Sequence, residues 1–288
     1  MAFDAAAFER DGAVLVRALL SPAEVADVQR WCADVASWPA APHLPYTLAH
    51  ETIDGVRTLC RVENFSPLHG GLAGVAERAR ALAGAALGAA RGGATLFKEK
   101  LNIKPPGGRG YGAHYDGPSA AAAGTRARTF VTVQVAVDAQ TAANGCLQLA
   151  APRAAWPPRA LVPPRDGNPD GGGRVGAIPD AVADGIDWAP AECAAGDALV
   201  FDHWAPHWSG PNRDARERRT LYFIFNAADE GDEREVYYAN MAAARAAWAA
   251  RAGAGGGAGE GARRDGDGDG GGDGGDGGGD GDGDGAMH

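Results

Sequence analysis

TFVTVQVAV, residues 129–137, alternates apolar or β-branched side chains with small or polar ones over its whole length. This period of two predicts a half-buried β-strand, because successive side chains of a strand point to opposite faces of the sheet. Further short strands are predicted on either side of it, at residues 95–104, 146–149, 198–202 and 220–226. Many short strands with turns between them are typical of a β-sandwich or a double-sheet barrel.

A helix is predicted ahead of these strands. Ser21 suits the N-cap, Pro22 suits the first helical position, and Glu24 completes a capping box. The apolar side chains that follow recur at helical spacing and form one face: Val25, Val28, Cys32 and Val35.

Two more helices and one short extended element are also predicted. A second helix, rich in Ala and Leu, is expected at residues 72–87, and residues 8–20 are expected to form a short extended element with a turn at Asp11-Gly12. A short Ala-rich helix is expected after Tyr237-Tyr238, ending near residue 252. The predicted fold class is α+β, mainly β, with helices flanking the N-terminal side of the sheet core.

Two segments lack any sustained period. Residues 151–195 are rich in Pro, Gly and Asp, and a loop of this length in a compact domain is usually a lid or a binding loop. Residues 253–288 repeat Gly and Asp and are too poor in apolar residues to bury a core. We therefore expect one domain at residues 1–252, followed by a disordered acidic tail.

Charge and composition exclude several classes of protein. The tail has eight Asp and one Glu against two Arg, so it carries −7 of the net charge of −10. The folded part is nearly balanced, which excludes a basic nucleic-acid footprint. No apolar run reaches the roughly 18 residues of a membrane span, and the acidic start MAFDAAAFERDG is unlike a targeting peptide. These features favour a cytoplasmic protein, and the four widely spaced cysteines are expected to be reduced core residues.

Three residues suggest a metal site. His114 and Asp116 form an H-x-D pattern, and residues i and i+2 of a strand point to the same face. His207 lies just beyond the predicted strand at residues 198–202. Two imidazoles and one carboxylate on one face of a metal form the facial triad of non-haem Fe(II) oxygenases. Arg218, at the start of the next strand, could grip the carboxylate of a co-substrate.

With these residues the chain resembles the phytanoyl-CoA dioxygenase family of Fe(II)- and 2-oxoglutarate-dependent oxygenases. The resemblance spans residues 8–238 and includes the opening FERDGAVLVRALLSPAEV, the H-x-D pattern and the Asn144-Gly145 turn. Its most specific part is GDALVFDHWAPHWSGPNRDARERR, residues 196–219, in which the distal histidine precedes S-G-P-N and the arginine follows eleven residues later. The resemblance implies a double-stranded β-helix, the cupin-like jelly roll.

The resemblance also implies cofactors and roles. Fe(II), 2-oxoglutarate and O2 are expected, with His114, Asp116 and His207 as metal ligands. Co-substrate contacts are expected from Arg218, Ser209, Tyr111, Lys98 and Asn102, with Thr132 and Gln134 as weaker candidates. A carboxylate at position 116 favours hydroxylation, because members of the family that halogenate have a small residue there. The expected reaction hydroxylates a C–H bond and releases succinate and CO2.

For some of these roles the sequence offers a second candidate residue. Arg219 could replace Arg218, but the two point to opposite faces of a strand and the spacing favours Arg218. His203 lacks the S-G-P-N that follows His207, so we expect it to lie behind the site or to face the substrate. Trp204 and Trp208 fit core positions or pocket walls equally well. Where many members have a P-G-S-H turn, this chain has Ala151-Pro152-Arg153.

The substrate is predicted only by class. Residues 96–108 and 221–238 are most similar to the branch that hydroxylates small aminoalkylphosphonates beside phosphorus. The expected partner is therefore a small, anionic molecule, and Lys100, Lys104, Arg109 or Arg126 could help to hold it. Three alternatives stay open from the sequence: hydroxylation of an acyl-CoA or another small metabolite, a jelly-roll binding protein without turnover, and an interaction module recruited through the acidic tail. The oligomeric state is not predicted.

Overall fold

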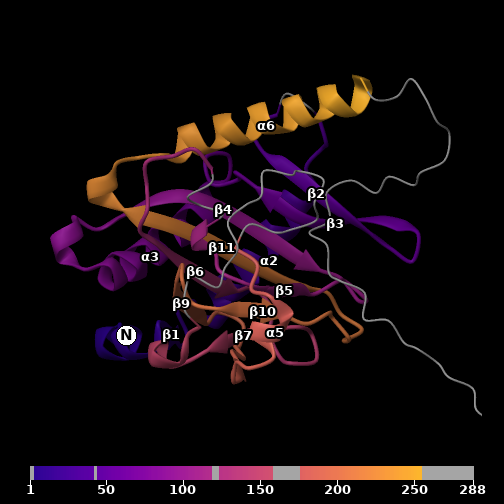
Figure 1. Ribbon diagram of the computed structural model, residues 1–288. Coiled ribbons are helices and arrows are strands. Elements are labelled where there is room, and N and C mark those ends of the chain that lie inside the picture. The colour runs from indigo at the N-terminus through magenta and orange to yellow at the C-terminus, as the bar shows by residue number, and fades with distance from the viewer. Residues whose placement is uncertain (1–2, 42–43, 119–122, 158–175, 255–288) are drawn as a thin grey trace, which may run out of the picture.

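The computed structural model describes residues 3–41, 44–118, 123–157 and 176–254 of the chain. Two antiparallel sheets form its centre (Figure 1). The larger sheet has seven strands in the order β1-β9-β6-β11-β4-β3-β2. The bounds of these strands, in chain order, are Ala13–Val16 (β1), Thr47–Ile53 (β2), Val56–Glu63 (β3), Ala94–Lys104 (β4), Phe130–Ala136 (β6), Ala198–Asp202 (β9) and Arg218–Ala227 (β11).

The smaller sheet has four strands in the order β5-β10-β7-β8. They are Tyr111–His114 (β5), Leu147–Ala150 (β7), Trp188–Pro190 (β8) and His207–Ser209 (β10). One apolar cluster holds side chains of both sheets, among them Leu149 of β7, Phe201 of β9 and Tyr222 of β11. We call the face of the large sheet that carries Phe201 and Tyr222 its inner face. The two facing sheets confirm the predicted jelly roll and the α+β, mainly β class.

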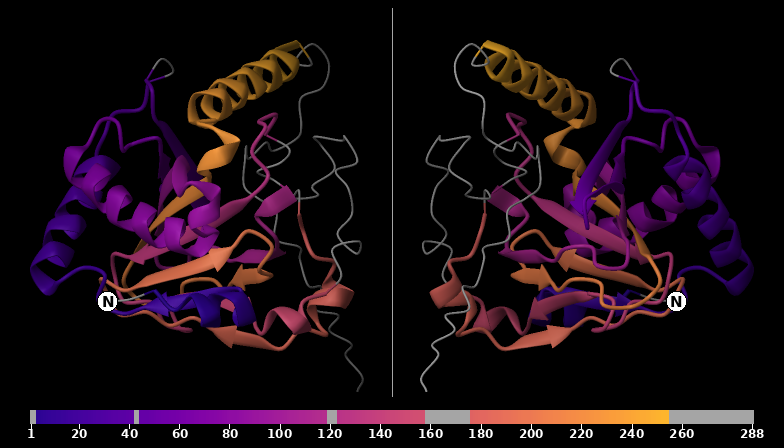
Figure 2. Two further views of the ribbon diagram at one scale, coloured as in Figure 1. Left: turned by 90° about the vertical axis from the view of Figure 1, so that its left-hand side faces the viewer. Right: turned by 90° about the vertical axis from the view of Figure 1, so that its right-hand side faces the viewer.

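Helices cover the opposite, outer face of the large sheet (Figure 2). Their bounds are Pro22–Ala36 (α2) and Gly70–Leu87 (α3). Their buried residues share a second apolar cluster with Val133 of β6 and Phe223 of β11. The predicted capping box at the start of α2 is present, since Ser21 and Glu24 each accept from the other's backbone N–H.

The remaining helical elements are α1 (Ala5–Asp11), α5 (Asp180–Ala183), α6 (Arg234–Ala254) and the single 3₁₀ turns η1 (Ala89–Arg91), η2 (Arg153–Ala155) and η4 (Ala228–Glu230). The helix α6 runs beside β4 and crosses the top of the molecule in Figure 1. It begins before Tyr237, so both tyrosines of the predicted helix boundary lie inside it. Within the described ranges, no helix has the length and apolar character needed to cross a membrane.

The structure differs from the sequence prediction near the N-terminus. Residues 8–11 are helical rather than extended, because Asp4 caps α1 by accepting from the backbone N–H of Ala7. Gly12, with φ of 75°, ends the helix in a left-handed conformation that glycine adopts without strain. The extended element is thus confined to β1.

Two further differences concern strands. The hairpin of β2 and β3 was not predicted, since most of its residues are half-buried and show no clear alternation. The strand β8 lies inside the segment predicted to be a loop, and it pairs with β7. Residues 158–175, the middle of that predicted lid, and residues 255–288 of the predicted acidic tail lie outside the described residues.

Candidate metal centre and co-substrate site

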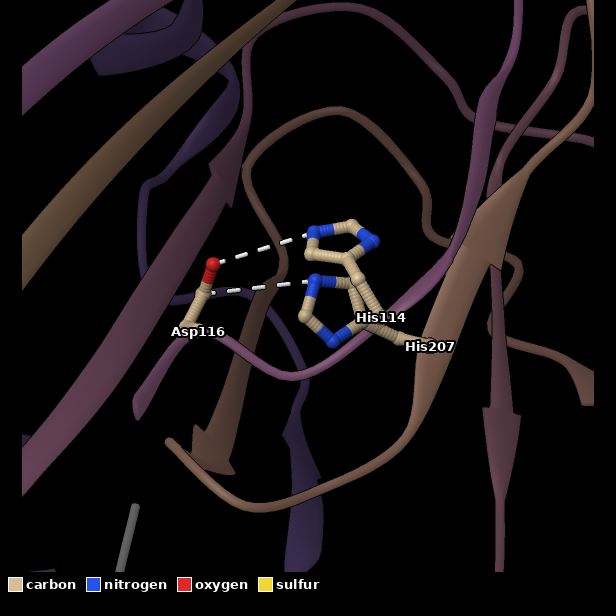
Figure 3. Close-up of side chains that lie close together, drawn as sticks. All are labelled: His114, Asp116 and His207. Carbon is tan, nitrogen blue, oxygen red and sulfur yellow. Dashed lines mark ion pairs between the residues drawn. The ribbon is translucent and has the colours of Figure 1, made fainter. Parts of the chain in front are cut away.

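Three side chains meet between the two sheets. His114 ends β5 and His207 begins β10, and the two residues are direct partners in the antiparallel pairing of these strands. Asp116 follows two residues after His114 and turns its carboxylate toward both rings (Figure 3). Its Oδ1 lies 3.8 Å from Nε2 of His114, and its Oδ2 lies 4.0 Å from Nε2 of His207. The structure therefore brings together the three residues that the sequence predicted as ligands.

Backbone carbonyls orient both imidazoles. Nδ1 of His114 lies 2.7 Å from the carbonyl oxygen of Gly112, and Nδ1 of His207 lies 3.0 Å from that of Ala205. A proton on each Nδ1 satisfies these contacts and leaves each Nε2 with a lone pair aimed at the carboxylate. This is the usual arrangement of a metal-binding histidine, whose second nitrogen donates to a backbone or carboxylate oxygen.

The donor set fits one divalent first-row metal ion. All of its ligand atoms lie within 4.8 Å of one another. Since a metal–nitrogen or metal–oxygen bond is about 2.0–2.2 Å for zinc, two donors of one ion lie up to about 4.4 Å apart. The distances of 3.8 and 4.0 Å from Asp116 to the two imidazoles fall within that limit. Burial tends to raise the pKa of Asp116, but His207, Lys100 and the neighbouring charges outweigh it and hold this pKa below its usual range. The carboxyl group is thus kept ionised, as a metal ligand must be.

Arg218 lies at one end of the site, where β11 begins. It is 4 % exposed, and its guanidinium donates to the carbonyl oxygens of Asn144 and Gly145 at 3.1 and 3.0 Å. It also donates to Oγ1 of Thr220 at 2.6 Å. The backbone carbonyl groups of the predicted Asn144-Gly145 turn therefore fix the position of the Arg218 guanidinium.

Arg219 does not compete for this position. Its guanidinium lies on the outer face, where it pairs with Asp138 at 2.8 Å and donates to the backbone oxygen of Gln29. The opposite directions of Arg218 and Arg219 follow from the alternation of side chains along β11. The arginine favoured by the sequence spacing is the one that faces the interior.

Lys104 also lies at the Arg218 end of the site. Its Nζ lies 3.0 Å from Oγ of Ser209 and 2.6 Å from the carbonyl oxygen of Gly210, and 5.7 Å from the ring centroid of Tyr111. Burial, with a smaller effect of Arg218, lowers its pKa to about 7. Lys104 was one of four residues that could hold a substrate anion. Its contacts place it beside Ser209 and near Arg218, among the residues predicted to contact the co-substrate.

The inner faces of β4 and β11 carry the other candidates. Asn102 lies opposite Thr220, Lys100 opposite Tyr222 and Lys98 opposite Ile224. Asn102 is thus next to the Arg218 end. Lys98 lies six residues along the strand from Lys104, about 20 Å away, so the structure does not place it with the residues of the co-substrate end. Sequence analysis did not single out Tyr222, whose phenol has its pKa raised to about 12, chiefly by burial.

The weaker candidates on β6 also face the interior. Oγ1 of Thr132 lies 3.4 Å from Oδ2 of Asp116. Gln134 donates to Gln140, which donates to Thr220, the residue that accepts from Arg218. Thr132 therefore touches the metal centre, and Gln134 supports the arginine through a buried chain of hydrogen bonds.

Other predicted residues lie elsewhere. Nδ1 of His203 lies 2.7 Å from the carbonyl oxygen of Phe130, and this histidine does not belong to the group of three potential metal ligands. Trp204 packs on Tyr115 and His203, and Trp208 packs on Trp188. Arg126 pairs with Glu233 at 2.8 Å, and its side chain is 85 % exposed. The remaining basic candidate, Arg109, is exposed.

Similar folds are found among solved structures. The epimerase SnoN, in a complex with Fe3+, alpha-ketoglutarate and nogalamycin RO, matches with a TM-score of 0.57 and 18% identity. That match covers 78% of this chain and 82% of the epimerase. EctD from S. alaskensis, with 2-oxoglutarate and 5-hydroxyectoine, matches with a TM-score of 0.55 and 20% identity over 78% of this chain and 76% of its own. Both similarities support the fold.

Curated relatives are more similar in sequence. A methylphosphonate hydroxylase from Gimesia maris is 37% identical over 235 residues, 81% of this chain and 83% of the relative. A 2-aminoethylphosphonate dioxygenase from an uncultured bacterium is 32% identical over 231 residues, 79% of this chain and 82% of the relative. The family model described as phytanoyl-CoA dioxygenase matches residues 8–220. The chain belongs to the phytanoyl-CoA dioxygenase family and is a dioxygenase that depends on Fe(II), 2-oxoglutarate and O2.

Proposed function

We propose that this dioxygenase hydroxylates a C–H bond of a small organophosphonate, and that His114, Asp116 and His207 hold its iron. The relatives named for methylphosphonate and 2-aminoethylphosphonate support this substrate class, because each matches about four fifths of the chain. The observation that carries the metal assignment is the convergence of two Nε2 atoms and one carboxylate within 4.8 Å.

The residues at the other end of the site suit the co-substrate. Arg218 presents a fixed, planar guanidinium that can take a carboxylate through two hydrogen bonds. Ser209 and Lys104, which lie 3.0 Å apart, add a hydroxyl and an ammonium beside it. We assign the distal carboxylate of 2-oxoglutarate to this end, with Tyr111 and Asn102 alongside.

Iron(II), when bound, supplies the redox chemistry by which O2 and 2-oxoglutarate convert the substrate C–H group to C–OH, with succinate and CO2 as the other products. The protein contributes position and shielding. The Nδ1 contacts of His114 and His207 fix both rings, and Asp116 stays ionised between them. Buried aromatic side chains on the inner face, among them Phe97, Phe130 and Phe201, exclude water from the space between the sheets.

The test is substrate-dependent turnover by the full-length protein with Fe(II) and 2-oxoglutarate. Methylphosphonate or 2-aminoethylphosphonate should raise succinate formation above its substrate-free level, and 31P NMR should show a new hydroxylated phosphonate. Asp116→Ala should abolish both signals, whereas Arg80→Gln, at an exposed position on α3, should leave them unchanged. Stimulation of succinate formation by other small metabolites but by no phosphonate would contradict the proposed substrate class.

A further inference from the structure

The distribution of lysine in this chain is uneven. Lysine and arginine together number 27, yet the sequence contains only three lysines, at positions 98, 100 and 104. All three belong to β4, where their even spacing places them on one face. Their partners in β11 are Ile224, Tyr222 and Arg218, which lie on the inner face. Every lysine of the protein therefore points toward the space between the sheets.

The three lysines divide into two groups. Lys104 belongs to the co-substrate end, since Arg218 is the neighbouring charge that most lowers its pKa. Lys98 lies opposite Ile224 of β11, which lies opposite Thr132 of β6, and Oγ1 of Thr132 is 3.4 Å from Oδ2 of Asp116. The neighbouring charges of both Lys98 and Lys100 accordingly include Asp116 of the metal centre. A strand rises about 3.3 Å per residue, so the backbones of Lys104 and Lys100 are about 13 Å apart. That distance is enough for two separate anion subsites.

Lys98 is positioned by contacts with Tyr237 of α6. Its Nζ lies 3.3 Å from the hydroxyl of Tyr237 and 4.9 Å from the centroid of that ring. Burial tends to lower the pKa of Lys98, but Tyr237, Glu63 and Asp116 outweigh it and raise this pKa. The half-buried side chain of Lys98 therefore carries a full positive charge.

Lys100 and Arg61 add two more cations next to it. Nζ of Lys100 lies 5.6 Å from the ring centroid of Tyr222, and burial together with Lys98 lowers its pKa to about 8. Arg61 of β3 lies opposite Asn102 in the pairing with β4, and its Nε lies 3.1 Å from Oε1 of Glu63. Glu63 in turn lies opposite Lys100.

Among the described residues, the charges of this cluster do not balance when the metal is bound. Lys98, Lys100 and Arg61 bring three positive groups, and Glu63 brings one negative group. Asp116 is the second carboxylate that acts on both lysines, and coordination to iron would use its charge. These side chains are half-buried, and an excess of positive charge that is partly withdrawn from water is costly unless an anion compensates it. A doubly charged tetrahedral oxyanion suits this excess, because it can accept hydrogen bonds from several donors at once.

We propose that Lys98 and Lys100, with Arg61 behind them, form the subsite that receives the phosphonate group of the substrate. This inference rests on the proposed function and extends it to the residues that bind the anionic group of the substrate. Lys104 serves the other anion, the distal carboxylate of 2-oxoglutarate.

The small number of lysines permits a direct test of binding. Full-length protein labelled with 13C-lysine gives three ε-methylene signals, which single Lys→Met variants assign. The protein is loaded with Zn(II) in place of Fe(II), so that no turnover occurs. We expect 2-oxoglutarate to shift the Lys104 signal and subsequent methylphosphonate to shift the Lys98 and Lys100 signals. A methylphosphonate titration that shifts Lys104 alone, or no lysine, would overturn the proposal.

Kinetics supply the second readout. Lys98→Met and Lys100→Met should each raise the KM for methylphosphonate or 2-aminoethylphosphonate about 10- to 100-fold, the range expected for losing one charge-assisted hydrogen bond. The KM for 2-oxoglutarate and the slow substrate-free formation of succinate should stay within about twofold of the wild-type values. Arg80→Gln serves as the matched control, since it removes one exposed positive charge from α3.

The two claims fail in different ways. If the wild type hydroxylates a phosphonate but both lysine variants keep its KM, the subsite is wrong and the proposed function stands. If phosphonates shift the Lys98 and Lys100 signals but are not hydroxylated, the anion subsite stands and the proposed substrate class is wrong.

Discussion

His207 of β10 pairs directly with His114 of β5, and their ring centroids lie 4.1 Å apart. Neighbouring strands of the small sheet thus bring together two side chains that are distant in sequence. The metal-binding geometry exists only when this strand pair has formed, so iron binding and folding of the small sheet are coupled.

His207→Ala should abolish iron binding and turnover, because it removes one of three converging ligand atoms. His203→Ala should retain iron, since its Nδ1 is engaged with the carbonyl oxygen of Phe130 rather than with the triad. Iron content after gel filtration and the shift in Tm on adding Fe(II) under argon measure both effects. Loss of iron from both variants would mean that the distal ligand is misassigned.

Gly145→Ala should destabilise the fold and weaken the Arg218 end of the site. Gly145 has φ of +71°, and a Cβ atom there would lie 2.2 Å from the carbonyl oxygen of Gly210. A left-handed conformation alone costs a non-glycine residue about 1–2 kcal/mol. We expect a loss of at least about 1–2 kcal/mol in the free energy of unfolding, together with a raised KM for 2-oxoglutarate.

Gly74→Ala is the matched control for this change. Gly74 is an exposed residue of α3, and a Cβ atom there meets nothing within 4 Å. Alanine should stabilise the helix by about 0.5–1 kcal/mol without altering the KM. A Gly145→Ala protein as stable as the wild type would contradict the described turn.

Lys104 and Lys100 should titrate near neutral pH in the metal-free protein. Burial lowers the pKa of Lys104 to about 7 and that of Lys100 to about 8, so the ε-methylene NMR signals should have midpoints near these values. In the unfolded chain each lysine keeps its ordinary pKa of about 10.4. Above pH 7 the unfolded state therefore binds more protons than the folded state, and the free energy of unfolding rises with pH. Bound 2-oxoglutarate should raise the Lys104 midpoint. A midpoint near 10.4 without ligand would contradict its burial.

The ion pair of Glu99 in β4 with Arg234 in α6 should contribute strongly to the free energy of unfolding. Glu99 is fully buried, accepts from the backbone N–H of Ser66 and binds Arg234 through both carboxylate oxygens. Glu99→Gln should lower the free energy of unfolding by about 2–4 kcal/mol, because it leaves the charge of a largely buried arginine uncompensated.

Adding Arg234→Met to Glu99→Gln should recover most of that loss, as a double-mutant cycle in urea would measure. Arg80→Met breaks the exposed pair of Arg80 with Glu77 and should change stability by no more than about 0.5 kcal/mol. Equal effects of Arg80→Met and Glu99→Gln would contradict the burial of the β4–α6 pair.

Much of the fold could be predicted because local patterns determine it. The strict alternation at residues 129–137 became β6, and the capping residues Ser21 and Glu24 began α2 where expected. The metal-centre residues were predictable for a different reason. H-x-D and the spacing from His207 to Arg218 are short patterns tied to one type of chemistry. The structure brings the three ligands together and buries His114, His207 and Arg218.

Other features depend on long-range contacts that no local pattern encodes. The sequence shows that Lys98, Lys100 and Lys104 share one strand face, but the separation of their roles depends on the pairing of β4 with β11. The hairpin of β2 and β3 was missed because its half-buried residues lack the alternation of a two-faced strand. Helix α1 was missed because a single cap, Asp4, and one buried side chain, Phe8, decide it.

The central claim is that the triad and Arg218 form one site for iron and 2-oxoglutarate. Anaerobic addition of Fe(II) and 2-oxoglutarate to the metal-free protein tests it most directly, through the weak visible charge-transfer band of the chelate. We expect the band in the wild type and in Arg219→Gln, whose arginine lies on the outer face. We expect no band in Arg218→Ala at the same concentration of 2-oxoglutarate. A folded wild-type protein without the band, or an Arg218→Ala protein that retains it in full, would contradict the account.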